Sequence, residues 1–361
     1  MAVTASACLV PSSNPVSFGP EDGPDPAIVT DIGAPNIAYV YTTNEFVSGG
    51  VWNVPSWVTN IPTGNPPARA FAHDSLPTLP VASNGNIWAP TVVPAAGGYL
   101  MLFSEGIAGR ADCIGAAQGD GVSFTPINTW TFCSGTISTG MLDPSLFVDP
   151  STGDYWMLYS QQWGPGGGSE IDAVQIDPIG IMDGADNCGF PLPDCGMLSP
   201  IYTMVTYSQL AWLNGTPGPN AMIEAPNMTA DRYNGYDLTF SLGTWFAPGT
   251  YETGEVACLD AYGACLPAKA GMILDDGDPS IGQANPGGAS TLSGQTPNNN
   301  YLIWHSFSTE SGGNRIDWIG PTSDYDANGT ASASEKALST DAAEATPITL
   351  ATEHPVAVPY H

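Results

Sequence analysis

Basic residues are almost missing from this chain, with 6 Lys and Arg against 35 Asp and Glu and a formal net charge of −29. The imbalance reflects missing bases more than surplus acids, because charged residues make up only 11% of the sequence. So few cations cannot neutralise many phosphates, which disfavours nucleic acid and anionic membrane surfaces as partners. An uncharged polymer is the compatible class of ligand.

Long apolar runs are missing as well. No stretch of roughly 18 or more apolar residues occurs, so we expect no membrane-spanning helix. The first residues, Met1 to Thr4, show neither the basic nor the apolar region of a signal peptide. We nevertheless expect a secreted protein, because the chain has seven cysteines and glycosylation sequons at Asn214, Asn227 and Asn328.

The spacing of the cysteines predicts three disulfides and one cysteine left over. The expected pairs are Cys188–Cys195 and Cys258–Cys265, with the same short spacing, and Cys113–Cys133, which leaves Cys8. A zinc site built from the four later cysteines is the alternative. Their spacing is wider than that of the usual zinc knuckle, so we expect no metal there.

Helical periodicity is nearly missing, and a strand-turn-strand unit recurs instead. In its clearest copy Asp143-Pro144 opens a short apolar strand, a polar turn ends at Gly153-Asp154, and an aromatic-rich strand covers residues 155–160. Four weaker copies begin at Asp25, Trp88, Ile223 and Pro286. Five such units, spaced like propeller blades with loop insertions, predict an all-β fold, a five-bladed β-propeller.

The propeller is expected to occupy residues 21–320. An N-terminal segment, residues 1–20, would precede it. Residues 321–361 are rich in Ala, Ser and Thr and would form a closing strand, a flexible tail or both, with 347–350 as their strand-like part.

Carboxylates occupy corresponding positions in three of the five units. Aligned at the start of the inner strand, the units carry Asp25, Ala89, Asp143, Glu224 one place earlier, and Pro286. Inner strands line the channel of a propeller, so Asp25, Asp143 and Glu224 should face one another at one end of it. Two such carboxylates can hydrolyse a glycosidic bond with inversion if they lie about 6.5–9.5 Å apart.

At these residues the sequence resembles glycoside hydrolase family 43, whose five-bladed propellers hydrolyse arabinose- and xylose-containing polysaccharides with inversion. The resemblance covers about residues 20–320. Its matching pieces include Asp25-Pro26-Ala27-Ile28-Val29, Asp74-Ser75-Leu76-Pro77-Thr78-Leu79-Pro80, Trp88-Ala89-Pro90-Thr91-Val92, Cys113-Ile114-Gly115-Ala116-Ala117, Leu142-Asp143-Pro144-Ser145-Leu146-Phe147, Ile223-Glu224-Ala225-Pro226 and Pro286-Gly287-Gly288-Ala289-Ser290. It implies that Asp25 is the general base and Glu224 the general acid. Asp143 would orient the sugar and raise the pKa of Glu224 through its charge.

The resemblance also bears on ions. Some members hold a calcium ion in the channel near a histidine, which here would be His305, but Gly288 stands where several carry a second one. We expect no required cofactor, with a structural calcium ion in the channel as the alternative.

Three further residues are candidates for binding substrate. Trp88 would stack on a sugar ring or pack between blades, while Arg315 and His305 would bind hydroxyl groups or serve in the structure. The expected substrate is a cell-wall polysaccharide or oligosaccharide with α-L-arabinofuranosyl linkages, and the expected state is a monomer.

Rival functions remain open at this point. The same carboxylates serve β-xylosidase and galactofuranose- or galactan-trimming activities, and a non-catalytic carbohydrate-binding propeller is a rival from another class. An invertase-type retaining enzyme would need its two carboxylates only about 5–5.5 Å apart.

Overall fold

A computed structural model shows the fold. It describes residues 8–11, 16–18, 24–30, 37–43, 45–47, 51–53, 56–60, 87–106, 112–121, 123–133, 139–163, 168–183, 196–210, 222–230, 235–244, 250–263, 265–274, 283–292, 301–308 and 315–325.

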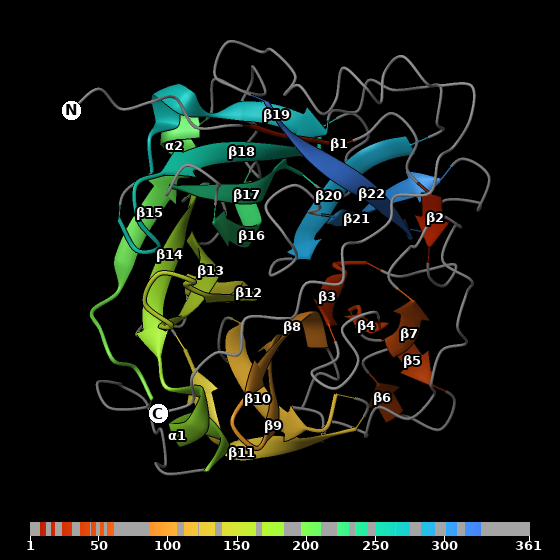
Figure 1. Ribbon diagram of the computed structural model, residues 1–361, viewed down its shortest axis with the longest axis vertical. Coiled ribbons are helices and arrows are strands. Elements are labelled where there is room, and N and C mark those ends of the chain that lie inside the picture. Colours follow the sequence, from red (N-terminus) through yellow and green to blue (C-terminus); the bar gives the residue numbers. More distant parts are fainter. Residues whose placement is uncertain are drawn as a thin grey trace.

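Five antiparallel sheets stand around a central axis, and the first strand of each lies nearest that axis (Figure 1). The prediction of an all-β, five-bladed propeller is therefore confirmed. Blade 1 contains β3 (Ala27–Thr30), β4 (Ile37–Tyr41) and β7 (Ser56–Asn60), beside the separate hairpin of β5 (Glu45–Val47) and β6 (Val51–Asn53). Blade 2 contains β8 (Ile87–Ala95), β9 (Gly98–Glu105), β10 (Cys113–Gly119) and β11 (Phe124–Phe132).

The remaining blades continue around the ring in chain order. Blade 3 contains β12 (Thr139–Val148), β13 (Tyr155–Trp163), β14 (Ser169–Ile176) and β15 (Tyr202–Thr206). Blade 4 contains β16 (Met222–Ala230), β17 (Tyr236–Gly243), β18 (Glu252–Cys258) and β19 (Gly271–Leu274). Blade 5 contains β20 (Gln283–Leu292), β21 (Tyr301–Ser308) and β22 (Arg315–Tyr325). The described helices are short: α1 (Pro178–Met182), α2 (Tyr207–Leu210) and η1 (Pro267–Lys269).

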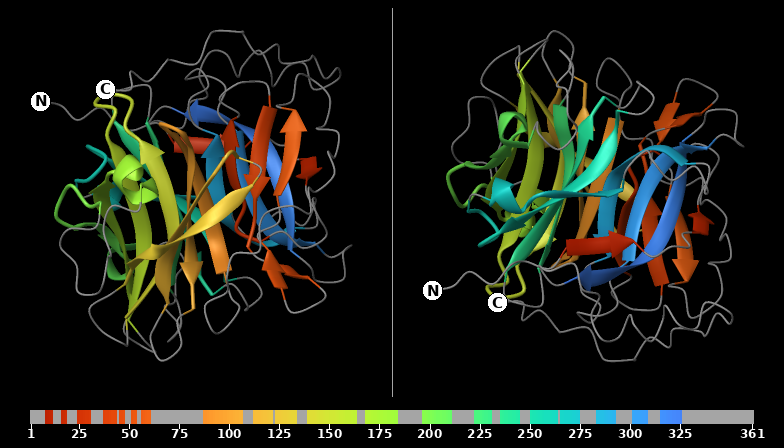
Figure 2. Two further views of the ribbon diagram at one scale, coloured as in Figure 1. Left: turned by 90° about the horizontal axis from the view of Figure 1, so that it is seen from below. Right: turned by 90° about the horizontal axis from the view of Figure 1, so that it is seen from above.

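The N-terminal part of the chain completes the last blade. Both β1 (Cys8–Pro11) and β2 (Val16–Phe18) pair with β22, so strands from opposite ends of the described chain lie side by side (Figure 2). This pairing ties blade 5 to the segment that leads into blade 1. The strands β1 and β2 lie in the expected N-terminal segment, residues 1–20. The strand β22 crosses the expected boundary between the propeller and the C-terminal segment at residue 321. The strand-like residues 347–350 lie outside the described part of the chain.

The core lies between neighbouring blades. The second strand of blade 4, β17, is buried along its whole length because it is covered on both faces. Phe240 on β17 and Leu158 on β13 belong to one cluster that joins blades 3 and 4. Burying a side chain of this size contributes about 1.5–3 kcal/mol. The blades therefore hold one another in register and fix the positions of the inner strands.

Two of the expected disulfides are confirmed: Cys113–Cys133 and Cys258–Cys265. The Cys188–Cys195 pair lies outside the described residues, as does the side chain of Cys8. No helix in the described part of the chain is long and apolar enough to cross a membrane.

Candidate active site

The inner strands share one local irregularity. In β8, β12 and β16 two consecutive residues stand opposite one residue of the next strand, which is a β-bulge. The first bulge residue has a positive φ, 43° at Ala89, 53° at Asp143 and 49° at Ala225, and Asp25 at the start of blade 1 has 54°. Each of these residues precedes a proline, which cannot donate to a strand ladder and so fits at a bulge. The bulge turns each of these positions toward the channel.

The fifth blade differs from the alignment we made from sequence. β20 has two register shifts, one between Ala284 and Gly287 and one between Gly287 and Ser290. Gly288, with φ 59°, occupies the place that Asp25 has in blade 1. The assignment of Pro286 to this place is wrong, because Pro286 belongs to the extra bulge.

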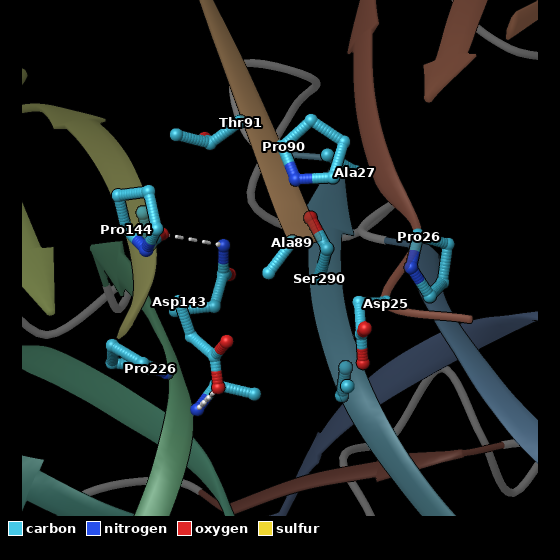
Figure 3. Close-up of a pocket in the computed structure, with 15 residues that line it drawn as sticks. Asp25, Pro26, Ala27, Ala89, Pro90, Thr91, Asp143, Pro144, Pro226 and Ser290 are labelled. Atoms are coloured by element: carbon cyan, nitrogen blue, oxygen red, sulfur yellow. Dashed lines mark hydrogen bonds between the residues drawn. The ribbon is translucent and has the colours of Figure 1, made fainter. Parts of the chain in front are cut away.

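The channel holds a pocket lined by three consecutive residues from each blade: 25–27, 89–91, 143–145, 225–227 and 288–290. Figure 3 shows Asp25 and Asp143 on opposite walls of this pocket, on different blades. Glu224 is the residue directly before the segment contributed by blade 4. The structure thus brings the three predicted carboxylates to one channel from three different blades.

Hydrogen bonds between neighbouring blades fix the bulges. In four of the five blades the N–H of the residue with positive φ donates to a side chain of the preceding blade, which lies on the second strand or directly after it. These bonds are Ala89 to Thr43 Oγ1 (2.9 Å), Asp143 to Ser104 Oγ (2.7 Å), Gly288 to Ser241 Oγ (2.8 Å) and Asp25 to His305 Nδ1 (2.9 Å). The carboxylates are therefore held by the ring of blades itself.

The boundary between blades 3 and 4 breaks this pattern. Ser160, which occupies the equivalent position there, donates instead to the carbonyl of Ile223 (2.8 Å). The N–H of Ala225 donates to Asp143 Oδ2 (3.0 Å). Asp143 is therefore anchored next to Glu224 by its own carboxylate.

Asp25 is partly open to the channel, with 21% of its side chain exposed. The hydroxyl of Thr43 donates to its Oδ2 (2.6 Å). The His305 ring lies beside it, with Nδ1 at 3.5 Å from Oδ1. Burial lowers the pKa of His305 to about 3, with the Asp25 charge opposing this shift and the Arg315 charge contributing to it. His305 is therefore neutral, and since Nδ1 accepts the Asp25 N–H, its proton is on Nε2.

Glu224 is buried and held at both oxygens. The Tyr251 hydroxyl donates to Oε1 (2.8 Å) and the Gln162 amide to Oε2 (3.0 Å). Burial raises the pKa of Glu224 to about 7 and the charge of Asp25 adds to this, whereas both hydrogen bonds and the Arg315 charge lower it. Much of this carboxyl group is therefore protonated at neutral pH, as a general acid requires.

Asp143 titrates together with its neighbours. Burial raises its pKa well above the usual range, and the charges of Glu224 and Asp25 raise it further. The hydrogen bond from Ala225 opposes this rise. Each of the three carboxylates thus lies within electrostatic reach of the other two.

Tyr251 and Gln162 did not emerge from the sequence. Tyr251 is buried and stacks on His305, with ring centroids 6.1 Å apart and planes at 12°. A Cβ at Gly287 would lie 2.0 Å from the Tyr251 ring, so only glycine leaves room for it there. These contacts join strands of different blades, and no local pattern marks them.

The other predicted residues lie as follows. Trp88 is half-buried directly before Ala89, the position that Glu224 has in blade 4. Arg315 begins β22 and is close enough to act on the pKa of Glu224. Among the described residues, no group of three or more His, Cys, Asp or Glu side chains could hold a metal ion.

The sequon at Asn227 is part of the channel wall. Its Nδ2 donates to Ser145 Oγ (3.2 Å), and its Oδ1 accepts the Thr291 N–H (3.0 Å). A glycan on the Asn227 side chain would displace its hydrogen bond to Ser145 and stand in the channel. The other two sequons lie outside the described residues.

Comparison with known proteins shows the fold. No family model and no curated protein matches this sequence. A thermostable family-43 glycoside hydrolase matches at TM-score 0.60 and 14% identity, over 89% of this chain and 94% of its own. An α-L-arabinofuranosidase from Lactobacillus brevis matches at TM-score 0.56 and 13% identity, over 87% and 95%. An α-L-arabinanase from Cellvibrio cellulosa in complex with arabinohexaose matches at TM-score 0.58 and 16% identity, over 88% and 97%. The chain has the fold of family-43 glycoside hydrolases.

Proposed function

We propose that the protein is an inverting glycoside hydrolase, with Asp25 as general base, Glu224 as general acid and Asp143 as the residue that orients both the sugar and the acid. The observation that carries the proposal is the meeting of three electrostatically coupled carboxylates from three blades, one of them with a pKa of about 7. Inversion requires one ionised and one protonated carboxyl group at the same bond.

The environments of the two carboxyl groups suit these opposite roles. Asp25 accepts a hydrogen bond from the Thr43 hydroxyl and lies partly open to the channel, where a water molecule can reach it. In the proposed step the water oxygen attacks the anomeric carbon while Asp25 takes the water proton. Glu224 gives its proton to the leaving oxygen as the glycosidic bond breaks, and exchange with solvent restores both groups.

The proposed substrate is a neutral oligosaccharide or polysaccharide with α-L-arabinofuranosyl linkages. Support comes from the charge of the chain, which disfavours anionic ligands, and from the names of the similar structures, an arabinofuranosidase and an arabinanase. Trp88 and Arg315 are proposed to contact the sugar and His305 to hold the backbone of Asp25. Secretion, a monomeric state and activity without an added cofactor belong to the same proposal.

Removal of each acid distinguishes the roles. Glu224→Gln should lose more activity on polysaccharide than on a nitrophenyl glycoside, by about 10²–10⁴-fold, because a good leaving group needs no proton. Asp25→Asn should abolish both reactions about equally, since both need the activated water. The assay compares wild type and variants on nitrophenyl glycosides of arabinofuranose, xylopyranose and galactofuranose and on the matching polymers.

The same screen addresses the rivals. If the wild type hydrolyses the xylopyranoside or the galactofuranoside faster than the arabinofuranoside, the proposed arabinose specificity is wrong and the β-xylosidase or galactan-trimming alternative takes its place. No hydrolysis of any glycoside by the wild type would favour a carbohydrate-binding propeller. Substantial residual activity of Asp25→Asn on both substrates would contradict its role as the base.

A further inference from the structure

Exposed apolar side chains gather at one end of blades 3 and 4. In the described part of the chain, the large hydrophobic side chains that are exposed all lie on the β14–β15 and β18–β19 connections: Ile179, Leu198, Ile201, Leu259 and Tyr262. Large apolar side chains that remain exposed on the loops at one end of a folded protein can mark an interaction site.

Three rings pack together at this end of the two blades, and we call them the aromatic platform: Trp156, Tyr202 and Tyr262. Tyr262 lies on Trp156 with ring centroids 4.9 Å apart and planes at 20°. Tyr202 lies beside Tyr262 at 5.3 Å. Trp156 is buried beneath, whereas Tyr262 is 42% exposed, so one face of a fixed ring is open to solvent.

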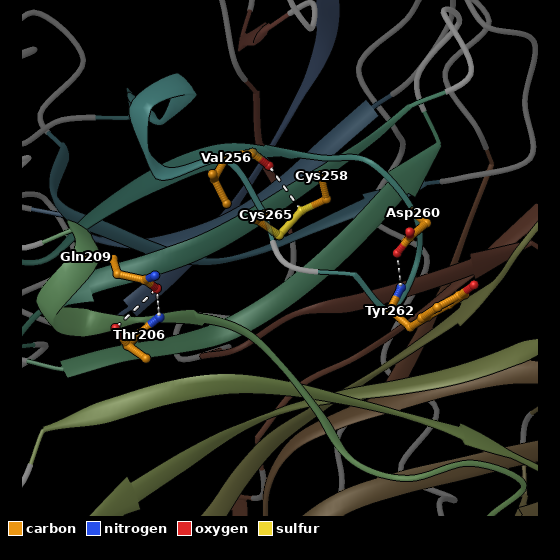
Figure 4. The surroundings of a disulfide bond; sticks show 7 residues. All are labelled: Thr206, Gln209, Val256, Cys258, Asp260, Tyr262 and Cys265. Atoms are coloured by element: carbon orange, nitrogen blue, oxygen red, sulfur yellow. Dashed lines mark hydrogen bonds between the residues drawn. A yellow bond between two sulfur atoms is a disulfide. The ribbon is translucent and has the colours of Figure 1, made fainter. Parts of the chain in front are cut away.

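The loop that carries Tyr262 is rigid. The Cys258–Cys265 disulfide closes it, and Tyr262 N–H donates to Asp260 Oδ1 (3.3 Å) within it (Figure 4). The same loop exposes Leu259, with 57% of this residue open to solvent. A short, cross-linked loop that holds two apolar side chains outward loses little conformational entropy when a ligand binds to it.

The platform is remote from the carboxylates. Trp156 and Gln162, which holds Glu224, are six residues apart on β13 and point to the same side of it. At roughly 3.3 Å per residue the platform lies about 20 Å from the acid, toward the opposite end of the propeller. A ligand on the platform therefore does not occupy the channel.

Charge selects the kind of ligand. Two carboxylates lie near the platform: the charges of Asp149 and Asp260 both raise the pKa of Tyr236, which belongs to the same core cluster as Trp156. Anionic ligands are repelled by these carboxylates, and a second copy of the chain, itself at −29, would bring like charges together. A neutral sugar ring can stack its apolar face on Tyr262 and donate a hydrogen bond from a hydroxyl group to the Asp260 carboxylate on the same loop.

We propose that the aromatic platform is a second, non-catalytic binding site for a neutral saccharide chain. The ligand class is that of the proposed function, on which this inference rests. The site would hold the polymer on the protein while another stretch of it occupies the channel.

Binding is tested in the Asp25→Asn background, which prevents hydrolysis, by electrophoresis of the full chain in gels that contain neutral branched arabinan. Adding Tyr262→Ala should weaken retention about three- to ten-fold, whereas Tyr262→Phe should stay within about two-fold, because it keeps the ring. With Asp25 restored, Tyr262→Ala should leave kcat/KM on the nitrophenyl glycoside unchanged and lower the activity on arabinan.

Four results would overturn the proposal. First, retention could be equal with and without Tyr262→Ala. Second, the Asp25→Asn chain could show no retention in arabinan while the wild type still cleaves the nitrophenyl glycoside; this second result would leave the proposed function standing. Tyr262→Ala could lower activity on the small substrate equally, which would indicate a structural role. Sedimentation could show a dimer that Tyr262→Ala dissociates, which would make the platform a self-association surface. If no glycoside is cleaved but retention depends on Tyr262, the proposed function fails and the binding site stands.

Discussion

The hydrogen bond from Tyr251 to Glu224 gives the sharpest test of the acid's environment. Tyr251→Phe removes one hydroxyl and keeps the ring that stacks on His305 and packs against Gly287. Burial raises the pKa of Tyr251 well above its usual value, with the charge of Glu224 adding to this, so the hydroxyl stays protonated and donates throughout the working pH range. Its loss therefore removes a donor that favours ionised Glu224.

The strength of the Tyr251–Glu224 hydrogen bond sets the expected shift in the pKa of Glu224. A hydrogen bond to a charged group contributes about 1.5–3 kcal/mol, and one pKa unit corresponds to about 1.4 kcal/mol. Without the Tyr251 hydroxyl the pKa of Glu224 should rise from about 7 by about one to two units. The charged groups that also act on Glu224, Asp25 and Arg315, are unchanged in this variant.

The sign of the shift is fixed by the role of the acid. In its proposed role as general acid Glu224 must be protonated, so activity falls as pH rises through its pKa, and a higher pKa moves this alkaline limb of kcat to higher pH. The assay is the pH profile of kcat on an arabino-oligosaccharide. Tyr207→Phe is the matched control, since the Tyr207 hydroxyl is buried without a hydrogen-bond partner among the described residues and its removal should leave the limb in place. An alkaline limb that does not move in Tyr251→Phe would refute the reasoning.

Three further changes have defined outcomes. Asp143→Ala removes the carboxylate that accepts the Ala225 N–H beside Glu224, so kcat should fall; an unchanged kcat would show that this contact does not help to position the acid. Gly288→Ala would place a Cβ 2.6 Å from an imidazole nitrogen, at a φ that favours glycine, and should lower both the melting temperature and kcat; equal values would show that the ring can move aside. Burial raises the pKa of Asp172 to about 6 and that of Glu170 to about 7, so the stability that their protonated forms provide is present below about pH 4 and lost as pH rises through 6–7. The Asp172 shift corresponds to about 3 kcal/mol, so the melting temperature should fall from pH 5 to pH 8, and it should fall less in Asp172→Asn.

The inner strands could be predicted because their signal is local. An acid or alanine before proline interrupts a short apolar strand, and this pair can be placed only at a bulge or an edge. Asp25 and Asp143 were therefore placed correctly. In blade 5 the same argument failed, because the glycines after Pro286 allow a second bulge and sequence alone gives no register there. The two confirmed disulfides also close short loops, 20 and 7 residues in separation.

Two of the groups that hold the carboxylates, Gln162 and His305, could not be predicted because they act across blades. Gln162 reaches Glu224 from 62 positions away, and His305 reaches Asp25 from 280 positions away. These contacts depend on how far each blade is rotated about the axis, which is set by packing over the whole core and not by any segment. The same holds for the pKa of Glu224, since burial in the assembled ring is its largest cause.

The stereochemistry of the first product tests the central claim most directly. Proton NMR of an α-1,5-linked arabino-oligosaccharide, recorded during wild-type hydrolysis and before mutarotation, distinguishes the two anomers of the released sugar. A single displacement by water at Asp25, with Glu224 as acid, predicts that the β-anomer forms first. First formation of the α-anomer would contradict the account and indicate a covalent intermediate on one of the carboxylates.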